Sequence, residues 1–243
     1  MAAKLLLAKI HIAKQEWNKA EVTLKEIIQS PLYQMETDIN KVFQKGGKHI
    51  LWQLKPHNNA SLRQATAYYF TNSVPNTYAI SASLLSTFQS NDLRMQNWTA
   101  PVVFNGNTYY RVEKYKNRNN TNTNEYSIVF RIEEVYLLLA EVLTQQNKIA
   151  EALPYVNRTR QRAQLTSLTL PITKDNLLKE ILTENHREFF AEGGHRFLDL
   201  KRTGKLGTLL TTKPNWKEFH KLWPVPQKEI LLNANLKPQN AGY

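Results

Sequence analysis

The sequence lacks cysteine, which excludes disulfide bonds, thiol catalysis and a lipid-bearing cysteine within these 243 residues. No apolar run approaches the roughly 20 residues that a membrane helix needs. Lys4, Lys9 and Lys14 interrupt the apolar start, so we expect no signal peptide there. The six histidines follow no metal-binding spacing. We therefore expect neither a metal ion nor a cofactor.

A hydrophobic content of 42% indicates a soluble, globular chain. The net charge of +12 raises the question of nucleic-acid binding. However, the basic residues are dispersed, and their densest patch, 111–118, contains Glu113 and precedes an uncharged run of Asn and Thr. The pattern favours a solvated basic surface with no nucleic-acid partner.

Residues 2–30 have the apolar spacing of a helical hairpin that ends before Pro31. The expected buried positions are Leu6, Leu7, Ile10 and Ala13 on the first helix, and Trp17, Ala20, Leu24, Ile27 and Ile28 on the second. Ala8 and Ala20 stand twelve residues apart, as do the small residues where the two helices of a tetratricopeptide repeat touch. We therefore predict a repeat-like hairpin over 2–31.

A second hairpin is predicted over 133–146 and 149–162. Its Leu139, Ala140 and Ala152 stand 132 residues after Leu7, Ala8 and Ala20. A third helical pair over 176–203 would add another layer, because repeats bury their faces only against neighbours. The expected fold is mainly α: a tetratricopeptide-repeat-like scaffold, with helical repeats over 129–204, that carries a large insert.

The insert, 32–128, is rich in Asn, Ser, Thr and aromatic residues. Strands are expected at 49–54, 101–104 and 108–115, a helical pattern at 80–88, and a surface loop at 116–126. This loop-rich, mixed α/β composition suits a binding face on a rigid frame. The tail, 205–243, contains Pro224, Pro226 and Pro238, and is expected to be extended rather than helical.

Residues 184–204, ENHREFFAEGGHRFLDLKRTG, combine a helix end, Gly193–Gly194 and a short amphipathic segment. The helix before it, 176–190, should be capped by Thr173 or Asp175. Its carboxylates alternate with Arg and Lys, which favours an ion-pair network at a helix corner over a catalytic site, because such carboxylates stay ionised. Arg196 and Asp199 are expected to be buried and paired.

Three groups of motifs resemble the SusD/RagB family of outer-membrane nutrient-binding lipoproteins. One group is Arg131, Glu134, Val135, Tyr136, Leu137, Ala140 and Glu141, continued by Asn157, Arg160, Arg162 and Ala163. Another is Glu184, Arg187, Glu188, Glu192, Gly194, Arg196, Asp199, Leu200 and Arg202, with Asn185 and His186 where arginines are commoner. The tail matches at Trp223, Pro224, Pro226, Glu229, Ile230, Gln239, Asn240, Gly242 and Tyr243, and the stretch Asn91, Asp92, Arg94 before Trp98 is similar.

The resemblance implies a single SusD-like domain over 1–243 that lacks its N-terminal part, where a signal peptide and a lipidated cysteine would lie. It also implies a surface lipoprotein of the outer membrane that caps a TonB-dependent transporter of the SusC type. Its ligand would be an oligosaccharide or polysaccharide, or in some members a peptide. The family does no covalent chemistry, so no enzyme is expected.

Sugar rings stack on exposed aromatic side chains while Asn, Arg and Asp hydrogen-bond to their hydroxyls. The candidate ligand-binding residues are Trp52, Tyr68, Tyr69, Tyr78, Arg94, Trp98, Tyr109 and Tyr110. Because aromatic residues are usually buried, we expect only two or three of these seven rings to face the ligand.

Two other functions are considered. A scaffold that binds a peptide or protein in the groove of its helical hairpins would need polar side chains on the repeats. A glycoside hydrolase would need two carboxylates roughly 5–10 Å apart in a cleft. The insert offers few acids for that role, mainly Asp92, Glu113 and Glu125, so hydrolysis is disfavoured.

Overall fold

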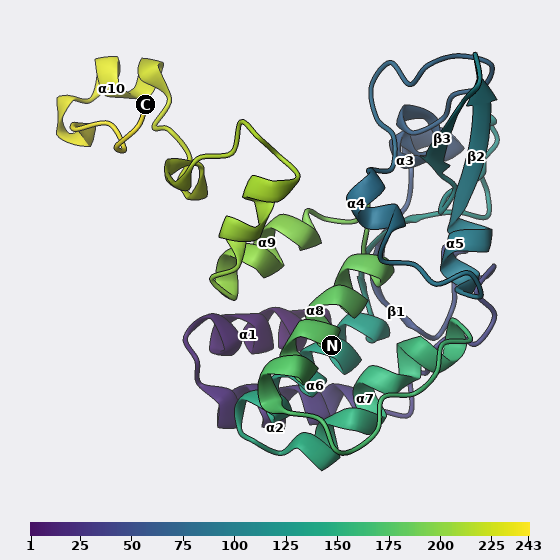
Figure 1. Ribbon diagram of the computed structural model, residues 1–243, viewed down its shortest axis with the longest axis vertical. Coiled ribbons are helices and arrows are strands. Elements are labelled where there is room, and N and C mark those ends of the chain that lie inside the picture. Colours follow the sequence, from purple (N-terminus) through teal and green to yellow (C-terminus); the bar gives the residue numbers. More distant parts are fainter. The chain divides into compact units, whose positions relative to one another are not determined.

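The computed structural model describes all 243 residues, which form two compact units, Met1–His195 and Arg196–Tyr243. Helices dominate the first unit (Figure 1). Its helices are α1 (Ala2–Ala13), α2 (Trp17–Ile28), α3 (Arg63–Ala67), α4 (Ala82–Leu85), α5 (Leu93–Trp98), α6 (Ile132–Gln145), α7 (Ile149–Arg162) and α8 (Lys174–Glu188). None of the helices of the chain is both long and apolar enough to cross a membrane.

Helical hairpins form the main core, as the sequence predicts. Helix α1 packs on α2, α2 on α6, and α6 on both α7 and α8. The four alanines at the predicted helix crossings, Ala8, Ala20, Ala140 and Ala152, have no exposed surface. Small side chains at these positions let each pair of helices approach closely, which confirms the repeated hairpins.

The predicted buried face of α1 is wrong. Leu6, Leu7 and Ile10 are between 45% and 52% exposed, whereas Leu5 and Ile12 are buried together with Ala8. Apolar residues occur all around α1, so periodicity alone does not single out one face. Contact with α2 selects the stripe that is buried.

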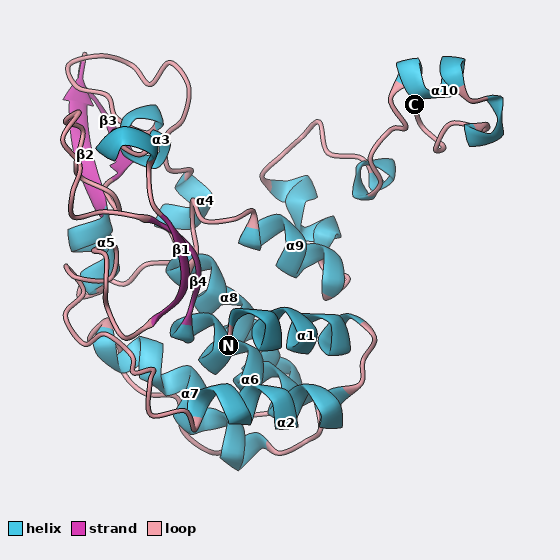
Figure 2. Cartoon of the chain, turned by 180° about the vertical axis from the view of Figure 1, so that it is seen from behind, coloured by secondary structure: helices cyan, strands magenta, loops and turns pink.

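The insert is mixed, with two small antiparallel sheets (Figure 2). Strand β1 (Ile50–Leu54) pairs with β4 (Ser127–Arg131), and β2 (Thr99–Phe104) pairs with β3 (Asn107–Val112). A 3₁₀ turn, η1 (His57–Asn59), follows β1. The helical pattern at 80–88 gives only the four-residue α4. The 116–126 loop is present as predicted.

A tight turn closes the β2–β3 hairpin. Asn105 and Gly106 occupy it with φ angles of 48° and 74°. Both residues tolerate positive φ, and an Asn-Gly pair fits the turn whose twist matches that of two antiparallel strands. The turn therefore fixes the register of β3, and with it the positions of Tyr109 and Tyr110.

The second unit contains α9 (His195–Arg202), which begins at the boundary, then η2 (Leu206–Thr211), η3 (Glu218–Lys221), α10 (Gln227–Leu232) and η4 (Ala234–Leu236). The expectation of a non-helical tail is therefore wrong. Pro226 directly precedes the first residue of α10, where a missing backbone N–H costs nothing. The prolines therefore start a helix here rather than prevent one.

The two tail motifs bind each other. The side chain of Gln239 accepts a hydrogen bond from Val225 N and donates one to Val225 O, both at 2.8 Å. Asn240 donates to Trp223 O at 2.6 Å, and Tyr243 donates to Leu222 O at 2.9 Å. Segments 222–226 and 239–243 thus close the tail on itself.

Candidate ligand-binding surface

Tyr68 and Tyr78 form an aromatic pair on the insert. Helix α3 ends at Ala67, and the chain returns through 72–78, so that the two rings meet edge to face with centroids 5.5 Å apart. Tyr78 is 55% exposed, while Tyr68 is half-buried. Burial raises the pKa of Tyr68, so its hydroxyl stays protonated. The pair offers apolar ring surface and a hydroxyl to solvent.

Tyr69, the next residue, is 41% exposed and contacts two arginines. The guanidinium carbons of Arg118 and Arg111 lie 3.9 Å and 4.5 Å from its ring centroid. Arg111 also donates to Phe70 O at 2.9 Å, which connects β3 to the segment that follows α3. Both arginines donate to Glu113, Arg118 at 2.7 Å. Two cations therefore share one carboxylate beside an exposed ring.

Strand β3 contributes Tyr109 and Tyr110, both half-buried. Ile80 N donates to Tyr110 O at 2.8 Å, which fastens the segment that carries Tyr78 to this strand. Tyr109 lies opposite the buried Val102 on β2, and Tyr110 lies opposite the exposed Pro101. Because neighbouring side chains of a strand point to opposite faces, Tyr109 and Tyr110 do not share one surface.

The Tyr68–Tyr78 pair and Tyr69 with its two arginines form the candidate surface. We call Tyr68, Tyr69, Tyr78, Arg111 and Arg118 the tyrosine surface.

Trp52 lies on the other sheet. It is 47% exposed on β1, and its ring is tilted against that of Phe130 on β4 with centroids 5.9 Å apart. Trp52 remains a candidate for ligand contact, on the β1–β4 sheet.

The prediction that Arg94 and Trp98 contact the ligand is wrong, because the structure buries both side chains. Trp98 is 1% exposed, donates from Nε1 to Ile39 O at 3.0 Å, and packs edge to face on Phe43. Arg94 has no exposed surface and binds Asp92 and Glu184. Helix α5 directs both side chains inward, so neither can stack on or hydrogen-bond to a ligand from solvent.

Arg94 belongs to a set of charged side chains in the interior of the first unit. We call this set the buried network: Asp92, Arg94, Lys114, Arg131, Glu133, Arg162, Glu184, Arg187, Glu188 and Glu192. Five are basic and five are acidic. All are buried except Glu192, whose side chain is 11% exposed.

Glu188 is the centre of the buried network. Its carboxylate accepts hydrogen bonds from Arg94 at 3.1 Å, Arg131 at 2.5 Å and Arg162. Burial by itself would raise the pKa of Glu188, but the three arginines lower it well below the ordinary value. The pKa values of Glu184 and Glu192 are lowered in the same way. The carboxylates are held ionised, which confirms the ion-pair interpretation.

Lys114 is the one ammonium group of the buried network. It donates to Glu192 at 2.6 Å and to Glu188 O at 2.8 Å, and it lies 4.0 Å from the Phe190 ring centroid. Burial lowers the pKa of Lys114 to about 8, although Glu192 opposes this change.

The prediction that Arg196 is buried and paired with Asp199 is wrong. Asp199 is buried, but it accepts hydrogen bonds from Arg202 at 2.8 and 3.1 Å, whereas Arg196 is half-buried. Residues three apart on a helix are neighbours, and Arg202 has this spacing from Asp199 just as Arg196 has on the other side. The three-residue spacing alone therefore does not predict whether Arg196 or Arg202 pairs with Asp199.

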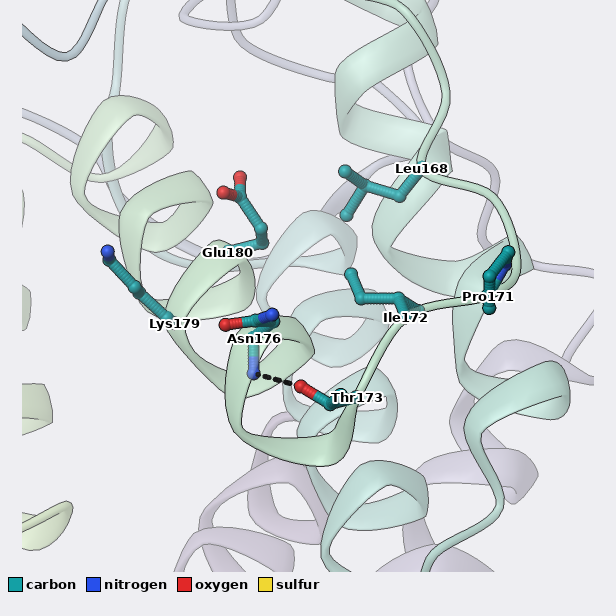
Figure 3. A pocket seen from close by; sticks show the side chains of 7 residues that line it. All are labelled: Leu168, Pro171, Ile172, Thr173, Asn176, Lys179 and Glu180. Atoms are coloured by element: carbon teal, nitrogen blue, oxygen red, sulfur yellow. Dashed lines mark hydrogen bonds between the residues drawn. The ribbon is translucent and has the colours of Figure 1, made fainter.

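Two hollows adjoin these elements in the first unit. One, of about 160 Å³, is lined by Asn40, Gln44, Lys116, Asn124 and Glu125 with Trp98 and Lys114 at the edge of the buried network. The other, of about 610 Å³, lies between the 168–173 segment and α8 (Figure 3). Its seven lining residues include no aromatic ring. No group of three or more His, Asp or Glu side chains is placed to hold a metal ion.

Residues 64–243 match the sequence profile of the SusD family. SusD-like protein P2 of Formosa agariphila is 34% identical over 149 residues, which are 56% of this chain and 29% of that protein. SusD-like protein P38 of the same organism is 33% identical over 124 residues, or 48% of this chain and 24% of that protein.

Solved structures show the same fold. A SusD superfamily protein from Bacteroides vulgatus matches with a TM-score of 0.79 at 20% identity, over 100% of this chain and 62% of that one. Surface glycan-binding protein A from Bacteroides thetaiotaomicron, solved in complex with laminarihexaose, matches with a TM-score of 0.76 at 22% identity, over 98% and 62%. This chain therefore spans less than two thirds of these proteins.

Proposed function

Because this chain belongs to the SusD family, we propose that it binds a glycan as the nutrient-binding component of an outer-membrane uptake system. The observation that carries the proposal is the tyrosine surface, where Tyr69 contacts the guanidinium groups of Arg111 and Arg118, and the adjacent Tyr68 pairs with the exposed Tyr78. The laminarihexaose complex of a structural neighbour supports a sugar as the class of ligand.

The chemistry of this surface suits a sugar. The pyranose C–H face is apolar and packs on a phenol ring, while hydroxyl groups at the ring edge need hydrogen-bond partners. Tyr78 and Tyr68 supply rings in an edge-to-face pair, and the loop whose Arg118 contacts Tyr69 exposes the amides of Asn119 and Asn120. The rings are held by packing before the ligand arrives, which reduces the entropy lost on binding.

We propose the remaining parts of the role from the family. The whole protein would be a lipid-anchored protein on the outward face of the outer membrane. It would cap a SusC-type TonB-dependent transporter and hold the glycan for import. A gene for such a transporter beside the gene of this protein would support this partnership, and co-purification of the two proteins would test it.

We propose binding without catalysis. The three acids considered for hydrolysis all have other partners: Asp92 binds Arg94, Glu113 binds Arg111 and Arg118, and the Glu125 carboxylate accepts from two backbone amides. All three are buried. A hydrolase needs one carboxyl that donates a proton and one that faces the sugar, and these residues supply neither.

Titration with soluble polysaccharides tests the proposal. Tyr78→Ala should weaken binding of whichever glycan binds, with the unfolding temperature nearly unchanged, because the ring is 55% exposed. Trp223→Ala is the matched control, since Trp223 is a 76% exposed aromatic residue of the other unit. Trp52→Ala asks whether the β1–β4 sheet contributes. Equal affinity of the Tyr78 and Trp223 variants would remove the tyrosine surface from the proposal.

The hollow beside α8 favours the alternative, a scaffold that binds a peptide. Its lining combines the apolar Leu168 and Ile172 with Asn176 and Lys179 on α8, as Figure 3 shows. The side-chain oxygen of Thr173 accepts a hydrogen bond from Asn176 N, so the first turn of α8 is already capped. A peptide library that selects binders sensitive to Lys179→Ala, together with silence across the glycan panel, would establish this function instead.

A further inference from the structure

Charge is unevenly distributed along the chain. Residues 39–130 contain ten Lys and Arg but only three Asp and Glu, so this segment carries a formal charge of +7 out of a total of +12. This segment bears the tyrosine surface, whereas the whole insert, 32–128, also contains Glu36 and Asp38 and carries a formal charge of +5.

Burial increases this imbalance at the surface. The three acids, Asp92, Glu113 and Glu125, are between 0% and 8% exposed. Six of the ten basic residues are exposed: Lys41, Lys45, Lys48, Lys55, Arg63 and Lys116. Within 39–130 the exposed charged side chains are therefore all basic, and one of them, Lys41, pairs with the preceding Asp38 at 3.7 Å.

The loop 113–126 connects this charge to the tyrosine surface. Arg118 on the loop stacks on Tyr69, and Lys116 lines the hollow of about 160 Å³. The far side of the loop is bound to the 40–46 segment, because Lys45 N donates to Asn124 O at 2.9 Å. The basic groups thus follow one loop from the aromatic rings to the hollow.

The two arginines at the rings are only partly neutralised. Arg111 and Arg118 share the single carboxylate of Glu113, which leaves one unit of positive charge. The Nε atom of Arg118 is buried without a hydrogen-bond partner. A guanidinium group binds carboxylate and sulfate groups through two parallel N–H donors, and contact with a ring face orients it.

We propose that the glycan bound at the tyrosine surface is acidic and carries carboxylate or sulfate groups that Arg118 and Arg111 contact. This inference rests on the proposed function and specifies its class of substrate. The sugar rings pack on Tyr78 and Tyr68 while the acidic groups lie toward the 113–126 loop. Spacing of acidic groups along a polysaccharide would let several of the exposed lysines contribute at once.

Nucleic acid and anionic lipid would also be attracted by positive charge. The tyrosine surface favours a glycan because both guanidinium groups contact the Tyr69 ring next to the Tyr68–Tyr78 pair, so that charge and ring surface are offered together. Double-stranded DNA should therefore bind more weakly than an acidic glycan of equal charge density.

The test compares polygalacturonate and alginate with dextran and laminarin by calorimetry. Each titration is run at about 50 mM and about 500 mM NaCl, which shortens the electrostatic screening length from roughly 14 Å to roughly 4 Å. We expect an acidic glycan to bind, and its affinity to fall about tenfold or more at high salt. Arg118→Gln should weaken that binding about tenfold, the usual worth of one charge-assisted hydrogen bond.

Two variants complete the design. Lys19→Gln removes one positive charge from α2, at a side chain that is 64% exposed, and should leave affinity unchanged. Arg118→Lys keeps the positive charge but lacks the two parallel N–H donors of the guanidinium group, so its affinity should lie between those of the original protein and Arg118→Gln. Unfolding temperatures of all variants show whether each remains folded.

The outcomes separate the two proposals. Binding of neutral glycans alone, or binding insensitive to salt and to Arg118→Gln, would overturn the acidic ligand and leave the proposed function standing. Equal affinity for double-stranded DNA would overturn it in favour of a general polyanion surface. No binding to any glycan would overturn the proposed function itself, and this inference with it.

Discussion

Replacing Glu188 by Gln should destabilise the first unit strongly. The substitution keeps the shape of the side chain but removes its charge, and it turns one acceptor into an amide NH₂ that faces guanidinium groups. Arg94, Arg131 and Arg162 all donate to this carboxylate, and all three are buried.

The magnitude follows from burial. Three charge-assisted hydrogen bonds at about 1.5–3 kcal/mol each would set an upper limit near 9 kcal/mol. The ion pairs also carry a desolvation cost that the neutral side chain avoids, and breaking a buried pair typically costs about 3–5 kcal/mol. We therefore expect Glu188→Gln to lower the free energy of unfolding by about 3–5 kcal/mol.

Urea unfolding followed by circular dichroism measures the loss. The control is Glu26→Gln, because Glu26 accepts from Lys4 at 2.5 Å, as short as the Arg131–Glu188 contact, but both side chains are 47% exposed. This exposed pair should contribute less than about 1 kcal/mol. Equal losses for the two variants, or a loss below about 1 kcal/mol for Glu188→Gln, would refute the argument that burial gives the network its energetic importance.

Three further predictions concern stability. Trp98→Ala should lower the free energy of unfolding by about 3–5 kcal/mol, because it opens a cavity in the core. Unchanged stability in urea would contradict the burial of Trp98. Acid should destabilise the first unit, because folding lowers the pKa values of Glu184, Glu188 and Glu192. Their contribution to stability is complete above the unfolded value near 4.5 and is lost as pH falls below it. Denaturation midpoints that do not change between pH 6 and about pH 3 would contradict this. Gly242→Ala should open the tail, because φ is 98° and the added Cβ would overlap the Phe219 ring; faster proteolysis of 222–243 would confirm it, and proteolysis at the original rate would oppose it.

Much of the frame was predictable because helices are local. The pattern of Trp17, Leu24 and Ile27 requires only the 3.6-residue period, and the structure buries Leu24 and Ile27 completely. The Thr173 cap on α8 and the positive φ of Gly193 and Gly194 are also local, and both are observed. The face of α1 was not predictable, because its apolar residues surround the helix.

The ligand-binding residues were harder to predict from the sequence than the helices. Sequence composition places Trp98 and Tyr78 in the same class, an aromatic residue of a loop-rich insert, yet one is 1% and the other 55% exposed. The Asn105–Gly106 turn was a usable signal for the β2–β3 hairpin, and it would have put Tyr109 and Tyr110 on opposite faces. Nothing local indicates that Arg111 and Arg118 meet Tyr69.

The sequence by itself determined the helical hairpins, the closely packed alanines and the family of the chain, because these depend on backbone periodicity and on short motifs. The tertiary structure alone decided what those motifs are for: Arg94, Arg131 and Arg162, up to 94 residues from Glu188, converge on one carboxylate. It also decided which rings remain in solvent. The reason is that burial and ion pairing depend on which distant segments meet, and a charge or an aromatic ring has the same local pattern whether it lies inside or outside.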